Sequence, residues 1–146
     1  MGKRLIRSSE GATMVELVIV LLILLIVLFG IGEASIALYD KAVLTNASRE
    51  GARAGIVAQN PRVTDGAIKD VVTKYATDNL ITFGADILGG EDITVTRTGS
   101  SFGSDLTVSV NYRYDFLVIS RLINMLLANA LGTHITLNAT TVMKLE

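Results

Sequence analysis

Residues 12–32 form one long apolar run whose single charge is Glu16. An α-helix rises about 1.5 Å per residue, so this run spans roughly 30 Å, the thickness of the hydrocarbon core of a bilayer. Basic residues precede the run within residues 1–11, whereas no basic excess follows it. The positive-inside rule therefore predicts a single-pass membrane anchor, with its N-terminus in the cytoplasm and the C-terminal bulk outside.

The helical pattern continues beyond the apolar run. Residues 33–59 are rich in helix formers and contain no proline, and the first proline of the chain is Pro61. The pattern predicts one helix from about Thr13 to Ala58, half in the membrane and half above it, that ends at Asn60 and Pro61 because a proline disfavours helix at the residue before it. A cleaved secretory signal peptide fits less well, since its apolar core is usually only about 7–15 residues long.

The rest of the chain, residues 60–146, shows shorter periodic segments. Thr64 and Asp65 are suited to cap a second helix that runs to about Asn79. Apolar and polar residues then alternate in a way typical of half-buried strands. The alternating segments are residues 93–98, 106–114 and 135–143. The pattern predicts an α+β head, in which a small antiparallel sheet of about three strands, with one or two short helices, packs against the upper half of the long helix.

Two further segments connect these elements. Residues 82–92 are rich in glycine and acidic residues and are predicted to form a loop. Residues 117–130 are apolar and are compatible with either a short helix or a buried connection.

Composition narrows the chemistry. The chain has 146 residues and a net charge of −1, so nothing in its charge suggests a nucleic-acid partner. It has no cysteine, and His134 is its single histidine, which leaves no ligand set for a zinc site. The serines of the turn at residues 99–105 have no histidine near them in the sequence. We therefore predict no catalytic residue, no metal and no cofactor.

Glu16 needs an explanation, because a carboxylate deep in a bilayer costs roughly 2.5–3.5 kcal/mol on insertion scales. One interpretation is that Glu16 lies close enough to the headgroups to stay hydrated. The other depends on the small residues Gly11 and Ala12 just before it. A cut between them would create an α-amino group at Ala12, four residues from Glu16. The amine of one subunit and the carboxylate of the next would then neutralise each other and fix the axial offset of two apolar helices.

Gly11, Ala12, Glu16 and the apolar run Leu17–Phe29 together resemble the processing site of type IV prepilins and pseudopilins. The resemblance implies that a prepilin peptidase cuts between Gly11 and Ala12 and that the helix then leaves the bilayer for a filament. It divides the chain into a leader (1–11), the transmembrane and assembly half of the helix (12–32), its exposed continuation (33–59) and the head (60–146).

A second resemblance is more specific. Residues 38–55 (LYDKAVLTNASREGARAG) are similar to the upper helix of TadE-like proteins of the Tad, Flp-type (type IVb) pilus system, and residues 136–146 are similar to the strand that ends many of them. The resemblance implies a minor pilin or pseudopilin that takes part in assembly of an adhesion pilus. The implied location is the bacterial inner membrane, with the head on the periplasmic or extracellular side. The implied partners are the prepilin peptidase, the major Flp-type pilin, another minor pilin, the inner-membrane assembly platform and the lipid bilayer.

Small residues recur on the upper helix at Ala47, Gly51 and Gly55. Each glycine weakens a helix by about 1 kcal/mol relative to alanine, which suggests that another backbone approaches closely here. Either a neighbouring subunit or the strands of the same chain would fit this stripe. Two alternative functions also remain open, namely a type II secretion-like pseudopilin and a signal-anchored monomeric binding protein at the outer face of the inner membrane.

Overall fold

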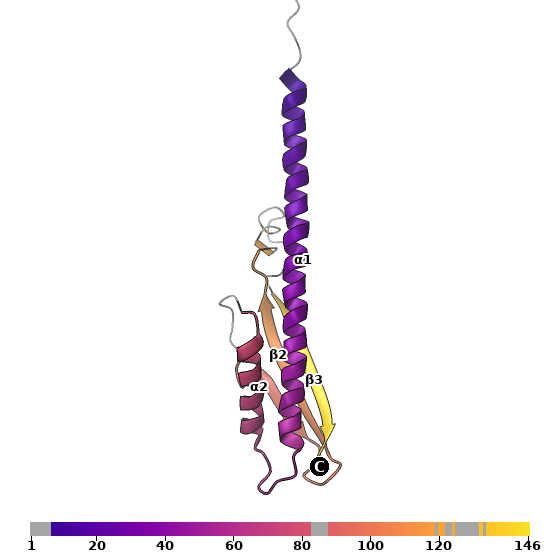
Figure 1. The fold of residues 1–146 in the computed structure, drawn as a ribbon, viewed down its shortest axis with the longest axis vertical. Coiled ribbons are helices and arrows are strands. Elements are labelled where there is room, and N and C mark those ends of the chain that lie inside the picture. Colours follow the sequence, from indigo (N-terminus) through magenta and orange to yellow (C-terminus); the bar gives the residue numbers. More distant parts are fainter. Residues whose placement is uncertain (1–6, 83–87, 119, 122–123, 125–131, 133) are drawn as a thin grey trace, which may run out of the picture.

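The computed structural model describes residues 7–82, 88–118, 120–121, 124, 132 and 134–146. The described elements are, in chain order, α1 (Arg7–Ile56), α2 (Asp65–Asn79), β1 (Ile93–Arg97), β2 (Asp105–Asp115) and β3 (His134–Lys144). A long N-terminal helix carries a small head made of α2 and an antiparallel sheet (Figure 1). The predicted α+β fold is confirmed.

The long helix α1 differs from its predicted bounds at both ends. It is already helical at Arg7, and it ends at Ile56 rather than at Ala58. The backbone N–H of Glu146 donates to the carbonyl of Ile56 at 3.1 Å. The C-terminus of the chain thus satisfies a carbonyl that has no partner within the helix, and so stabilises its end before Pro61 is reached.

The sheet has the strand order β1-β2-β3, and both pairs are antiparallel. The central strand β2 alternates as the sequence predicts, because every second side chain is buried. These buried side chains are Leu106, Val108, Val110, Tyr112 and Tyr114. They belong to one buried core with residues of α1 and α2, while the intervening polar residues alternate to the other face of the strand.

The short helix α2 begins and ends as predicted. The hydroxyl oxygen of Thr64 accepts a hydrogen bond from the backbone N–H of Ala67 at 3.2 Å, which caps the helix. Its buried face consists of Ile68, Val72 and Ala76. This face packs against α1, and the side of α2 nearest the sheet contacts β1.

Three predicted segments fall wholly or partly outside the described residues. They are residues 1–6 of the leader, residues 83–87 of the predicted loop and most of the predicted connection 117–130. What the sequence predicts for the residues outside the described ones stays a prediction.

Candidate functional site

The predicted processing and assembly residues lie on the unburied part of α1. Gly11, Ala12 and Glu16 are all exposed within one unbroken helix. A Cβ atom built at Gly11 would meet no atom within 4 Å, so the fold of this chain does not require glycine there. A requirement for glycine at this position would have to come from another molecule.

The apolar half of α1 is not covered by the chain itself. None of residues 11–32 is buried, and the most apolar window of the helix has a mean hydropathy of 3.2. Within the part of the chain that the structure describes, α1 is the one helix long and apolar enough to cross a membrane. Its length and composition indicate a membrane anchor.

The two glycines of the small-residue stripe pack against α2 of the same chain. Ala47 is fully buried. A Cβ atom at Gly51 would lie 2.3 Å from Cγ2 of Val72, and one at Gly55 would lie 2.5 Å from side-chain atoms of both Ile68 and Leu106. Side chains of α2 are thus close neighbours of both glycines. At Gly55, Leu106 of β2 is a close neighbour as well. The sequence singled out the stripe but did not identify α2 as its neighbour.

Three polar residues of α1 also face the head, although no sequence motif singled them out. The carboxylate of Glu33 accepts the backbone N–H of Val118 at 2.5 Å, and that of Asp40 accepts the backbone N–H of Ile81 at 3.0 Å. The hydroxyl of Ser48 lies 2.7 Å from that of Thr141. Glu33, Asp40 and Ser48 lie on the face of α1 that also buries Ala37 and Leu44. Their helical spacing was the signal in the sequence from which this buried face could have been predicted.

Burial changes the chemistry of Asp40. Its side chain is fully buried, and its Oδ2 atom has no hydrogen-bond partner. Desolvation raises the pKa of Asp40 above its ordinary value of 3.8, and the hydrogen bond from Ile81 opposes this only in part. The pKa of Tyr114 is raised as well, first by burial and then by the carboxylates of Glu33 and Asp40. The surroundings of Asp40 therefore disfavour its charged form more than water does.

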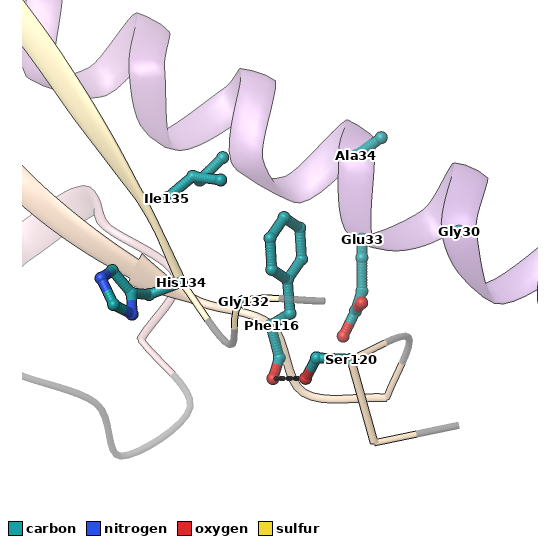
Figure 2. Close-up of a pocket in the computed structure, with 8 residues that line it drawn as sticks. All are labelled: Gly30, Glu33, Ala34, Phe116, Ser120, Gly132, His134 and Ile135. Atoms are coloured by element: carbon teal, nitrogen blue, oxygen red, sulfur yellow. Dashed lines mark hydrogen bonds between the residues drawn. The ribbon is translucent and has the colours of Figure 1, made fainter. Parts of the chain in front are cut away.

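A hollow opens beside α1 where the apolar half ends and the head begins (Figure 2). This hollow, the Phe116 pocket, has a volume of about 450 Å³. Its lining includes Glu33 and Ala34 of α1, Phe116 and Ser120 after β2, and Ile135 of β3. In Figure 2 the ring of Phe116 lies between Ala34 and Ile135. The Ser120 hydroxyl donates to the carbonyl of Phe116, so this polar group is already satisfied.

The described residues show no candidate metal site. No group of three or more His, Cys, Asp or Glu side chains comes together among them. His134 is exposed at the start of β3, and in Figure 2 its ring points away from Phe116. It thus starts a strand, as the alternation of residues 135–143 suggests.

The comparison with protein families gives one match. Residues 11–53 match the model of TadE-like proteins. The matched segment begins at Gly11, contains Glu16 and extends through the upper half of α1 to Arg53. The predicted resemblance to TadE-like proteins is therefore confirmed over this segment, whereas the resemblance at residues 136–146 lies outside it. No curated protein and no solved structure matches the chain.

Proposed function

We propose that this protein is a minor pilin or pseudopilin of a Tad-type adhesion pilus. A prepilin peptidase removes residues 1–11, and the mature chain takes part in pilus assembly. The observation that carries the proposal is the position of Glu16. This charged side chain lies exposed in a half-helix that the chain itself leaves uncovered, within the segment that matches TadE-like proteins.

The chemistry of assembly follows from that position. A carboxylate in an apolar environment is stabilised when an opposite charge joins it there. Cleavage after Gly11 supplies such a charge as the α-amino group of Ala12. When the Ala12 amine of one subunit meets the Glu16 carboxylate of another, the two helices are displaced by about four residues, or roughly 6 Å. The surrounding apolar side chains provide the contact area but no register, so the ion pair sets the offset.

The test uses the full chain in a bacterium that carries a Tad assembly system, with Gly11→Val and Glu16→Gln as variants. Gly11→Val should keep residues 1–11 and stay in the membrane, although its fold is intact because nothing crowds a side chain there. Glu16→Gln should be processed normally, yet enter sheared filaments about tenfold less or worse, since breaking a buried ion pair costs about 3–5 kcal/mol.

The matched control is Glu50→Gln, which removes an exposed carboxylate from the head half of the same helix, where it pairs with Arg53. It should be processed and incorporated like the unchanged chain, because exposed ion pairs contribute little. Normal incorporation of Glu16→Gln would show that the proposed pairing is wrong. A chain that keeps residues 1–11 in the presence of the peptidase would instead support a signal-anchored monomer.

A further inference from the structure

The end of the head farthest from the apolar half of α1 carries an exposed aromatic side chain. Phe102 lies in the turn between β1 and β2, and 85% of it is accessible. No other large hydrophobic side chain among the described residues is as exposed. This turn lies near the C-terminal end of α1, because its neighbour in space, Leu145, precedes Glu146, which caps Ile56.

The turn, residues 99–104, is held in one conformation by backbone hydrogen bonds. Gly103 has a φ of 81°, which glycine adopts without strain. Its N–H donates to the carbonyl of Leu145 at 2.9 Å, and the N–H of Leu145 donates to the carbonyl of Ser104 at 2.8 Å. Phe102 is therefore presented by a preorganised turn, and ordering it on binding costs little conformational entropy.

The opposite end of the head carries the Phe116 pocket. Its walls are mainly apolar, and its volume of about 450 Å³ exceeds the roughly 150 Å³ that suffices for a benzene ring in an engineered cavity. The ring of Phe116 lies edge to face with Tyr114, at a centroid distance of 5.7 Å. An entering aromatic ring would find both apolar walls and an aromatic neighbour.

The two features cannot meet within one chain. The pocket is beside Glu33 and the turn is near Ile56, so about 35 Å of helix separates them. A common membrane anchor makes α1 of every copy point the same way. A second copy, displaced by one head length along this direction away from the membrane, would bring its Phe116 pocket to Phe102 at the membrane-distal end of the first head.

We propose that Phe102 of one copy inserts into the Phe116 pocket of a second copy, head above head. The proposal rests on the proposed function, since parallel copies at different heights occur in a filament. A contact between two different surfaces of the same chain that also displaces one copy along an axis cannot close into a ring, and so it repeats along that axis. The contact between Phe102 and the pocket displaces two copies by about one head length, whereas the pairing of Glu16 with Ala12 would displace them by roughly 6 Å. The two contacts therefore join different pairs of subunits.

Cysteine cross-linking tests the contact directly, because the chain has no cysteine of its own. One tagged copy carries Phe102→Cys and a second, differently tagged copy carries Ala34→Cys, which lines the pocket from α1. Mild oxidation of assembled material should link the two tags. The control replaces Phe102→Cys by Val142→Cys, at an apolar side chain of β3 that is 58% exposed and lies outside both surfaces. It should give about tenfold less product, because a disulfide forms only across a short Cα separation.

The outcomes separate this contact from the proposed function. Processed and assembled chains without a preferential link between positions 102 and 34 would overturn this inference alone. Chains that remain unprocessed would overturn the proposed function. The contact would then fall with it, because copies anchored in one membrane lie at the same height and cannot stack head above head.

Substitutions provide an independent readout. Phe102→Ser should fold and be processed normally but enter filaments about tenfold less, since burial of an aromatic side chain is lost, while Phe102→Tyr should retain incorporation. Val142→Ser is the control and should behave like the unchanged chain. If Phe102→Ser assembles normally while the pocket-filling Ala34→Phe does not, another occupant such as a lipid chain fills the pocket, and the proposal is wrong.

Discussion

The two halves of α1 are parts of one helix, yet they are built for different surroundings. From residue 11 to residue 32 no side chain is buried, and Glu16 is the single charge on an otherwise mainly apolar surface. From Glu33 to Gly55 one face is buried at helical spacing, and the opposite face is exposed. The buried face of the head half is covered by α2 and the sheet of the same chain, whereas the apolar half has to be covered by lipid or by other subunits.

Two glycines, one in each half of α1, show what this difference means. A Cβ atom built at Gly32, at the end of the apolar half, would meet no atom within 4 Å, whereas one built at Gly51 would lie 2.3 Å from Cγ2 of Val72. Substitutions in the head half should therefore change the stability of the isolated molecule. Substitutions in the apolar half should change only its behaviour with other molecules. The predictions below test this division, in order of decreasing effect.

The largest effect is expected from matched leucine truncations. Leu44→Ala removes a fully buried side chain and should lower the free energy of unfolding of the head by about 2–5 kcal/mol. Leu24→Ala removes a side chain that is 58% exposed in the apolar half and should leave that quantity unchanged. Thermal unfolding of the detergent-solubilised chains measures both. Equal losses would show that the two halves do not differ in this way.

Matched glycine substitutions should have the next largest effect. Gly51→Val forces side-chain atoms into Val72 and should destabilise the head by about 1–3 kcal/mol, the usual cost of overpacking. Gly32→Val meets open space and should not change head stability. Chemical unfolding of the two variants is the measurement. If Gly51→Val were as stable as the unchanged chain, the close packing of α1 on α2 would be refuted.

Acidity should affect the head half through Asp40. Because its folded pKa is raised, the folded state holds its proton more tightly than the unfolded state. This group's contribution to stability is therefore present at low pH and is lost as the pH rises through the raised pKa, with a slope of at most about 1.4 kcal/mol per pH unit.

Asp40→Asn keeps an oxygen that can accept the Ile81 N–H and should remove this part of the pH dependence. The exposed Asp70→Asn should not. Unfolding measured across a pH series distinguishes the two variants. An unchanged slope in Asp40→Asn would contradict the assignment.

The smallest effect is expected at the cap of α2. Thr64→Ala removes the hydroxyl that accepts from Ala67 and should cost about 1 kcal/mol. Thr73→Ala, within the same helix, removes a hydroxyl without uncapping an end and should change stability by a few tenths of a kcal/mol at most. Thermal unfolding again provides the comparison. A loss at Thr73 as large as that at Thr64 would argue against a role for the cap.

Local elements were predictable because their signals are local. The cap at Thr64 and the alternation of β2 depend on neighbouring residues, and both are present in the structure. The ends of helices and strands that depend on residues elsewhere in the chain were harder to predict from the sequence. Thr98 was expected to extend the first strand, but its hydroxyl accepts the N–H of Asp105 at 2.9 Å and helps to close the turn. Likewise, Glu146 ends α1 from the far end of the sequence.

The candidate site divides in the same way. Glycine spacing singled out Gly51 and Gly55, but which element faces them depends on how α2 folds back. Glu33 and Asp40 were visible in the sequence as charges, while their burial depends on segments more than forty residues away. Gly11, Ala12 and Glu16 stay predictions for a different reason. Their proposed partners are a peptidase and neighbouring subunits, and a single chain contains neither.

The most direct test of the central claim is the intact mass of the protein recovered from cells with and without prepilin peptidase. With the peptidase, we expect a chain that begins at Ala12. Without it, the leader should remain attached. Recovery of a chain that still begins at Met1 in cells with the active peptidase would leave Glu16 without its proposed amine partner and would contradict the account.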